Sequence, residues 1–127
     1  MGALAEIYKA LRARLARSGV PVGGTADYPR IEIHSLVESA ALDKEGDIKQ
    51  VTCIVECISN RKMHDVQEMH EENLHRMLGN ALQLGDNWQV FGIVCGQVQE
   101  MTEVSDTNAI IYRLLQNVTI YVERING

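Results

Sequence analysis

The chain has 127 residues, of which 46% are hydrophobic and 23% are charged, and its formal net charge is -5. These fractions match ordinary globular proteins, at about 45 to 50% and about 25%, and therefore exclude a disordered or fibrous chain. A chain of this length is expected to fold as one domain, residues 1–127, around a single hydrophobic core.

Nothing in the sequence predicts a membrane span or a leader. The apolar runs, such as residues 90–94, fall far short of the roughly 20 residues that cross a bilayer, and residues 1–10 lack a basic segment followed by an apolar one. The three cysteines, Cys53, Cys57 and Cys95, lie in strand-like stretches and are odd in number, which favours reduced and buried thiols. We therefore expect a reducing compartment, the cytoplasm, and no membrane partner.

Acidic residues dominate the charge pattern. No Lys or Arg occurs between Arg76 and Arg113. This argues against nucleic acid as a specifically bound partner, because binding of that kind requires basic side chains on the phosphates. The basic residues concentrate near the end of the first helical segment, where they complement the helix dipole: Lys9, Arg12, Arg14 and Arg17.

The first third of the chain predicts a helix and then a strand. Helical spacing of apolar residues, from Leu4 to Leu15, predicts a helix over residues 3–18 that Gly19 and Pro21 end. Alternating apolar residues, Ile31, Ile33 and Val37, then predict a strand that begins near residue 30.

A charged turn at residues 43–47 and a second alternating run, residues 51–58, predict a hairpin. Ile54 and Ile58 fall on the face of this run that is opposite to Val51 and Cys53. That second face is therefore expected to be covered, either by a partner subunit or by another element of the chain.

A second amphipathic helix is predicted over residues 62–78, with Ser59 or Asn60 as its N-cap and Gly79 with Asn80 at its end. A third strand starts near Trp88, and its Gly92 and Gly96 are expected on the helix-facing side, unless they mark a bend or a bulge.

A turn at residues 103–108 leads into a last run, residues 110–124, whose length predicts a bend near Gln116 and Asn117. The resulting fold class is α+β, in the order α-β-β-α-β-β, with a mostly antiparallel sheet and two helices packed on one face.

No catalytic set, metal site or cofactor site is predicted. His64, His70 and His75 are separated by six and five residues, so they point in different directions around a helix. A zinc motif of the HExxH kind needs two histidines four apart. Gly23 and Gly24 are not followed by the Lys and Ser or Thr of a phosphate loop, and we interpret them as part of a linker.

The order of elements resembles the small tail terminator proteins, or tail completion proteins, of long-tailed bacteriophages and prophages. The resemblance rests on the Pro-preceded strand (residues 28–33), the strand that ends in Ile58, Ser59 and Asn60, and the closing strand pair (residues 110–124). It implies a non-enzymatic structural protein, assembled in the host cytoplasm and located in the virion tail. Its subunits would form a ring, typically of six, that caps the tail tube protein, ends tail polymerisation and meets the head-tail connector protein, while DNA passes through the hole without specific binding.

Acidic loops suit such a channel, because negative side chains do not hold DNA. We therefore expect two loops to face the lumen or the neighbouring tail and head proteins: Asp43, Lys44, Glu45, Asp47 and Lys49 in one, and Glu100, Glu103 and Asp106 in the other. Ile54 and Ile58 are the predicted subunit-contact face.

The alternative is a dimeric α+β module that binds a small molecule or a peptide between the second helix and the sheet, around His70 and Trp88. An enzyme would instead need a deep polar pocket that holds a carboxyl or thiol group of strongly shifted pKa.

Overall fold

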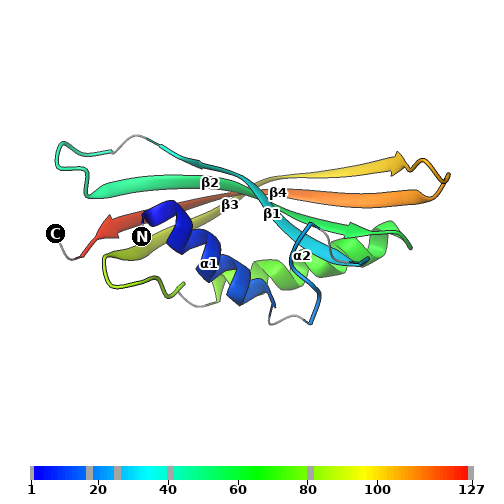
Figure 1. Cartoon of the computed structure of the whole chain (residues 1–127), viewed down its shortest axis with the longest axis horizontal. Helices are drawn as coiled ribbons and strands as arrows, with labels where there is room; N and C mark the ends of the chain where they lie inside the picture. Colours follow the sequence, from blue (N-terminus) through cyan, green and yellow to red (C-terminus); the bar gives the residue numbers. More distant parts are fainter. Residues whose placement is uncertain (1, 17–18, 25–26, 40–41, 80–81, 126–127) are drawn as a thin grey trace.

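A computed structural model describes residues 2–16, 19–24, 27–39, 42–79 and 82–125. It contains two helices and four strands in the predicted order, so the predicted α+β fold class is confirmed (Figure 1). The elements are α1 (Ala3–Ala16), β1 (Arg30–Glu38), β2 (Ile48–Ser59), α2 (Met63–Leu78), β3 (Trp88–Val104) and β4 (Ile110–Arg124). Neither helix is long and apolar enough to cross a membrane.

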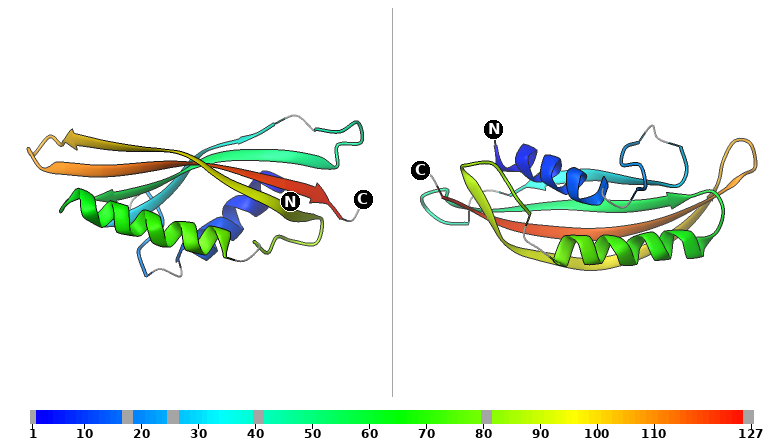
Figure 2. Two further views of the ribbon diagram at one scale, coloured as in Figure 1. Left: turned by 180° about the vertical axis from the view of Figure 1, so that it is seen from behind. Right: turned by 90° about the horizontal axis from the view of Figure 1, so that it is seen from below.

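The four strands form one sheet in the order β1-β2-β4-β3, and every neighbouring pair is antiparallel. β2 and β4 form the centre because the two predicted hairpins join through these strands. The sheet is long and twisted, and the β1–β2 turn and the β3–β4 turn lie at opposite ends of the long axis (Figure 1, Figure 2). We call these the turn end and the arm end, and the arm is residues 98–116, where β3 and β4 extend as a hairpin.

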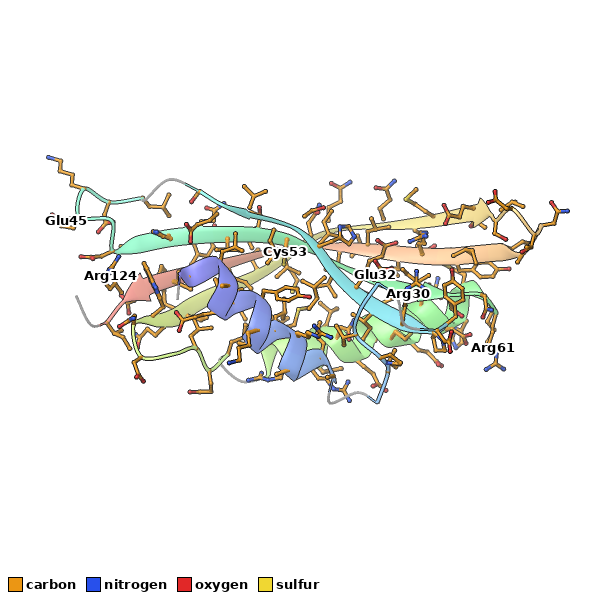
Figure 3. All side chains as sticks on the ribbon, in the orientation of Figure 1. Arg30, Glu32, Glu45, Cys53, Arg61 and Arg124 are labelled. Carbon is orange, nitrogen blue, oxygen red and sulfur yellow. The ribbon has the colours of Figure 1, made fainter. Side chains whose placement is uncertain are left out.

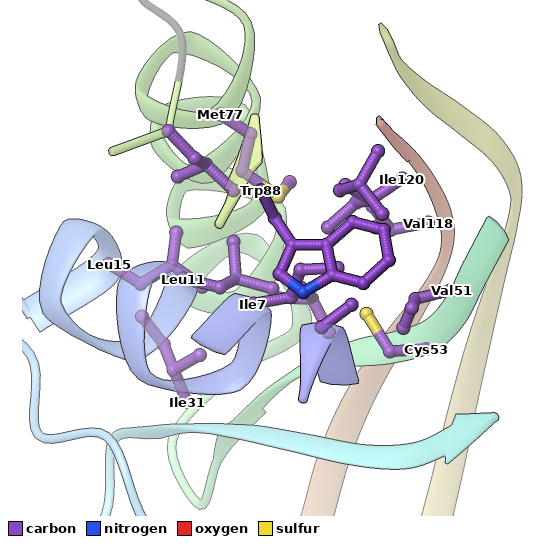
Figure 4. Close-up of a cluster of buried hydrophobic side chains, with 14 residues drawn as sticks. Ile7, Leu11, Leu15, Ile31, Val51, Cys53, Met77, Trp88, Val118 and Ile120 are labelled. Atoms are coloured by element: carbon purple, nitrogen blue, oxygen red, sulfur yellow. The ribbon is translucent and has the colours of Figure 1, made fainter. Parts of the chain in front are cut away.

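Both helices cover the same face of the sheet (Figure 2). The apolar residues of α1 recur every four positions, so Ile7, Leu11 and Leu15 form one stripe that is fully buried. They pack with Trp88, Met77 and the apolar residues of β2 and β4 in the main core (Figure 4). A smaller core under the start of α2 contains Cys57, Val66 and Leu114.

The end of α2 is confirmed, with Gly79 as its C-cap, but the start of α2 differs from the predicted one. α2 is capped by Lys62, which has extended backbone and makes no side-chain cap hydrogen bond. The predicted cap Ser59 is still in β2, where its hydroxyl donates to Asp65 Oδ2 at 3.1 Å and accepts from the Arg61 N–H. α1 is described as far as Ala16, and the predicted helix positions Arg17 and Ser18 and the end signal Asn80 lie outside the described residues.

Bulges in β3 exchange its two faces. The pairing with β4 shifts between Val90 and Gly92, so Trp88 and Val90 face the helices while Gly92 and Val94 face away from them. The helix-side position predicted for Gly92 is therefore wrong, and the bulge interpretation is correct. A simple period of two could not show this, because one extra residue inverts every later side chain.

The long last strand is continuous, and the irregularity lies in its neighbour. β4 pairs with β3 and β2 along its length, while β3 shifts register between Cys95 and Val98. Gln116 of β4 is buried, and its Nε2 donates to the carbonyl oxygen of Gly96 at 2.6 Å. The Gln116 amide thus satisfies a carbonyl that the bulge removes from the ladder.

β1 also carries a bulge, between His34 and Val37, where Ser35 has a positive φ of 58°. Ile31, Ile33 and Val37 were predicted to share one face of the strand. Ile31 and Ile33 do face the helices together, but beyond the bulge Leu36 takes the helix side and Val37 is 59% exposed on the other side.

Candidate assembly surfaces

The β1–β2 turn is built around Asp43. One carboxylate oxygen of Asp43 accepts the N–H groups of Asp47 and Ile48, at 2.8 and 3.0 Å, and Gly46 supplies a positive φ of 75°. Lys44 and Glu45 are exposed, and Glu45 points outward at the turn end (Figure 3). Asp43 therefore holds the turn in shape, while Lys44 and Glu45 are available to a partner.

The turn is also fastened to the end of β4. The Arg124 N–H donates to the Asp47 carbonyl at 2.7 Å, and the Arg124 guanidinium lies 3.4 Å from the Asp47 carboxylate. The same guanidinium stacks on the Trp88 ring at 4.8 Å. Arg124 thus links the turn to the core residue Trp88, and these contacts hold the turn in position.

Lys49 does not belong to this loop. It lies in β2 on the helix side, 3.5 Å from the Glu38 carboxylate, with its ammonium 5.3 Å from the centre of the Trp88 ring. Predicting Lys49 as a loop residue was wrong, because β2 begins at Ile48, three residues earlier than the apolar alternation indicates.

The second predicted loop is mostly strand. β3 runs to Val104, so Glu100 and Glu103 are arm residues and only Asp106 lies in the turn. Glu100 accepts a hydrogen bond from the Gln67 amide of α2 at 2.7 Å, and Glu103 accepts from Arg113 of β4 at 2.7 Å. These two carboxylates face opposite sides of the arm, since their positions differ by an odd number.

The two predicted loops therefore lie at opposite ends of the molecule (Figure 1). They therefore do not form one acidic surface. If both loops contact other proteins, those contacts are separate surfaces.

The face of the sheet that the helices leave uncovered carries a buried polar network. Glu56 has only 7% of its side chain exposed, and it binds His34 Nε2 at 2.8 Å and Arg113 Nη1 at 2.7 Å. Arg113 then binds Glu103, so four strands contribute one residue each. Burial alone would lower the pKa of Arg113, but the hydrogen bonds that Arg113 donates to Glu56 and Glu103 outweigh this effect and hold the pKa above its usual value.

The predicted contact residues on this face divide into two kinds. Ile58 is fully buried within the single chain and offers no surface to a partner, whereas Ile54 is half-buried. A signal for the network was present in the sequence, since Glu56 is the one charged residue in an apolar run, residues 51–58. Its partners were not recognisable, because they come from three other strands.

A groove lies between α2 and the segment that precedes β1. Its lining is mixed, with Val20, Pro29, Ile31 and Met69 apolar and Arg61, Asp65, Glu68, Glu72 and Asn73 polar. Asn73 donates from Nδ2 to Cys57 Sγ at 3.2 Å, while its buried Oδ1 has no hydrogen-bond partner. This groove is not the pocket that was predicted around His70 and Trp88. Trp88 does not line it and is instead a core residue.

The thiols are core groups. Burial raises the pKa of Cys53 to about 11 and that of Cys57 to about 12, so both are protonated and unreactive at neutral pH. Burial also raises the pKa of Cys95 and lowers that of His70. Among the described residues, no group of three or more His, Cys, Asp or Glu side chains could hold a metal ion.

No protein-family model and no curated protein matches the chain. Its fold does match a solved structure: a chain of the structure described as the virion of a native gene transfer agent particle has a TM-score of 0.69. The match covers 95% of this chain and 94% of that chain, at 16% sequence identity. The two chains therefore share one fold over nearly their whole lengths.

Proposed function

We propose that this chain is a non-enzymatic structural protein of a phage-like virion. The observation that carries the proposal is the fold shared with a virion chain over 95% of the residues. The resemblance to tail terminators, seen in the order of elements, points in the same direction. A virion protein also gives a use to an elongated sheet with a projecting turn at each end (Figure 1).

Within that class, the proposed role is that of a tail terminator. Copies of the chain would form a ring, six being typical of the resembled family, that caps the tail tube, ends its polymerisation and offers a surface to the head connector. The protein would assemble in the host cytoplasm and reside in the virion tail. Its net charge of -5 suits a channel that DNA passes without being held.

Deletion of the gene from the genome that encodes it tests this role. A terminator mutant should accumulate heads without tails together with tails of uncontrolled length, which electron microscopy of the lysate would show. Complementation with the wild-type gene should restore joined particles. Tails of normal length in the deletion strain would remove the terminator role.

The turn end can be tested in the same assay. Because Asp43 holds the turn through its carboxylate oxygen, its charge is best removed as Asp43→Asn, which keeps an acceptor. Combined with Glu45→Lys and Asp47→Asn, this change should impair head joining while leaving the thermal midpoint of unfolding close to that of the wild type. Glu71→Lys, an exposed charge reversal on α2, is the matched control. Wild-type yields of joined particles from the triple variant would exclude the turn end as a joining surface.

A ligand-binding module is the second candidate, and one observation favours it. The groove on α2 contains the unpartnered Asn73 oxygen, which a donor group of a ligand could satisfy after a small local opening. A screen for compounds that raise the melting temperature of the wild type but not of Asn73→Leu tests this candidate. No such compound would be found if the protein serves assembly alone.

A further inference from the structure

Each edge of the sheet has a free segment. On β1, the first part of the edge is closed by the preceding chain, because Gly23 N–H donates to the Ile31 carbonyl and Ile31 N–H donates to the Pro21 carbonyl, both at 2.8 Å. Beyond that bridge, residues 33–38 have no strand on their outer side within the described chain. Unpaired strand edges are templates for pairing with another chain.

The β3 edge is free along the arm. Residues 98–104 pair regularly with β4 on one side, after the last bulge, and no described strand lies on the other side. This segment also exposes apolar side chains on both of its faces: Val98 and Met101 are each 42% exposed, and Val104 is 67% exposed. A two-sided apolar arm is unusual for a segment that only meets water.

We propose that residues 98–104 of one copy pair with residues 33–38 of a second copy, as an antiparallel extension of the sheet. The strand directions permit this without reversing either molecule. In the order β1-β2-β4-β3 each strand opposes its neighbour, so β3 of one copy opposes β1 of a next copy that has the same orientation. The helices of both copies then stay on one face.

The side chains suit this pairing on both faces. On the uncovered face Met101 would lie beside the exposed Val37. On the helix face Val104 would lie beside Leu36, which already packs against the core. Apolar side chains that are paired across antiparallel strands stabilise a sheet.

α1 supplies a flank for the incoming strand. Its helical spacing places Leu4, Tyr8 and Arg12 on one side, next to the stripe that packs on the sheet. This side faces the β1 edge, because Arg12 Nη2 lies 3.9 Å from the position that a Cβ on Gly23 would occupy, and Gly23 borders β1.

The charges also decide against the simplest competing contact. Two β3 edges could pair with each other about a two-fold axis, but β3 carries Glu100 and Glu103 and contains no Lys or Arg. Such a dimer would place like charges across the junction, which is unfavourable. The β1 segment, residues 33–38, has one acidic residue and one histidine, and the arm meets less repulsion there.

Because the free β1 segment and the arm lie on the two opposite edges of the sheet, the contact is head to tail. A head-to-tail contact uses two different surfaces and continues from copy to copy until it closes as a ring or extends as a filament. The junction follows from the two edges alone, while its closure into a ring rests on the proposed function.

Disulfide trapping tests the junction. Residues opposed across antiparallel strands have Cβ atoms about 4.5 to 5.5 Å apart, so paired cysteines on one face can be oxidised to a disulfide. The double variants combine Val37→Cys with Gln99→Cys, Met101→Cys or Glu103→Cys, which share the uncovered face and cover three registers. At least one should give a ladder of dimers, trimers and larger species on non-reducing gels, and single variants should give none beyond the wild-type background.

Val37→Cys combined with Glu100→Cys is the control for side-chain direction, because Glu100 faces the helix side. Three results would each overturn the junction. They are a ladder from this control pair alone, dimers from the single variant Met101→Cys, and no cross-linked species in any variant. Particles that contain the protein but yield no ladder would overturn the junction and leave the proposed function standing. A ladder from a protein that is absent from particles would support the junction and overturn the proposed function.

Discussion

The buried carboxylate of Glu56 offers a quantitative test of the folded chain. Arg113→Met removes the guanidinium that binds Glu56 at 2.7 Å and keeps the apolar stem that Arg113 lays on the sheet. Glu56, with 7% of its side chain exposed, would keep only the His34 ring as a hydrogen-bond partner. The variant therefore measures what a nearly buried charge costs when its main partner is lost.

The expected loss lies between two limits. Breaking a fully buried pair costs about 3 to 5 kcal/mol, and breaking an exposed pair costs about 0 to 1 kcal/mol. Because Arg113 is 24% exposed, water can enter the space it leaves, and His34 remains 2.8 Å from Glu56. We expect a decrease of about 2 to 3 kcal/mol in the free energy of unfolding, which lowers the melting temperature by roughly 6 to 12 °C for a domain of this size.

Urea unfolding followed by circular dichroism at pH 7 gives the free energies. Glu103→Gln, which alters only the half-exposed partner of Arg113, is the control and should cost less than about 1 kcal/mol. The double variant Glu56→Leu/Arg113→Met removes both charges and should regain most of the loss. A loss below about 1 kcal/mol in Arg113→Met, or a double variant less stable than either single one, would refute the buried-charge reasoning.

Two further predictions concern the core thiols and the β1–β2 turn. Cys53 and Cys57, with pKa values of about 11 and about 12, should resist a thiol reagent at pH 8 in the folded chain, and half-buried Cys95 should react slowly; rapid reaction of all three without urea would contradict this. Because folding keeps these thiols protonated, stability should be complete below about pH 8.5 and decrease at higher pH, as the thiols of the unfolded chain ionise. Gly46→Ala should cost about 1 to 2 kcal/mol in urea unfolding because of its φ of 75°, whereas exposed Lys44→Ala in the same turn should be neutral, and equal values for both would exclude backbone strain as the cause.

The candidate surfaces were only partly predictable. Glu45 and Asp106 are in turns, as their local sequence indicates, because charged and turn-forming residues act within a few positions. Ile58 was expected to be available to a partner and is buried, since its burial depends on residues distant in the chain. The free edges at β1 and at the arm were not predicted. They depend on the strand order, which is set by the pairing of β2 with β4 between the two hairpins.

Helical and alternating periodicity, together with turn residues, determined the number, type and order of the elements. These signals are local, since the spacing of apolar residues within one helix or strand reports which side must leave water. The tertiary structure alone decided the face of β3 on which Gly92 and Val94 lie, the meeting of Glu56 with His34 and Arg113, and the separation of the two turns. Each of these features depends on strand register and strand order. One bulge residue moves the following side chains to the other face of the sheet, and the alternation of apolar residues in the sequence does not reveal it.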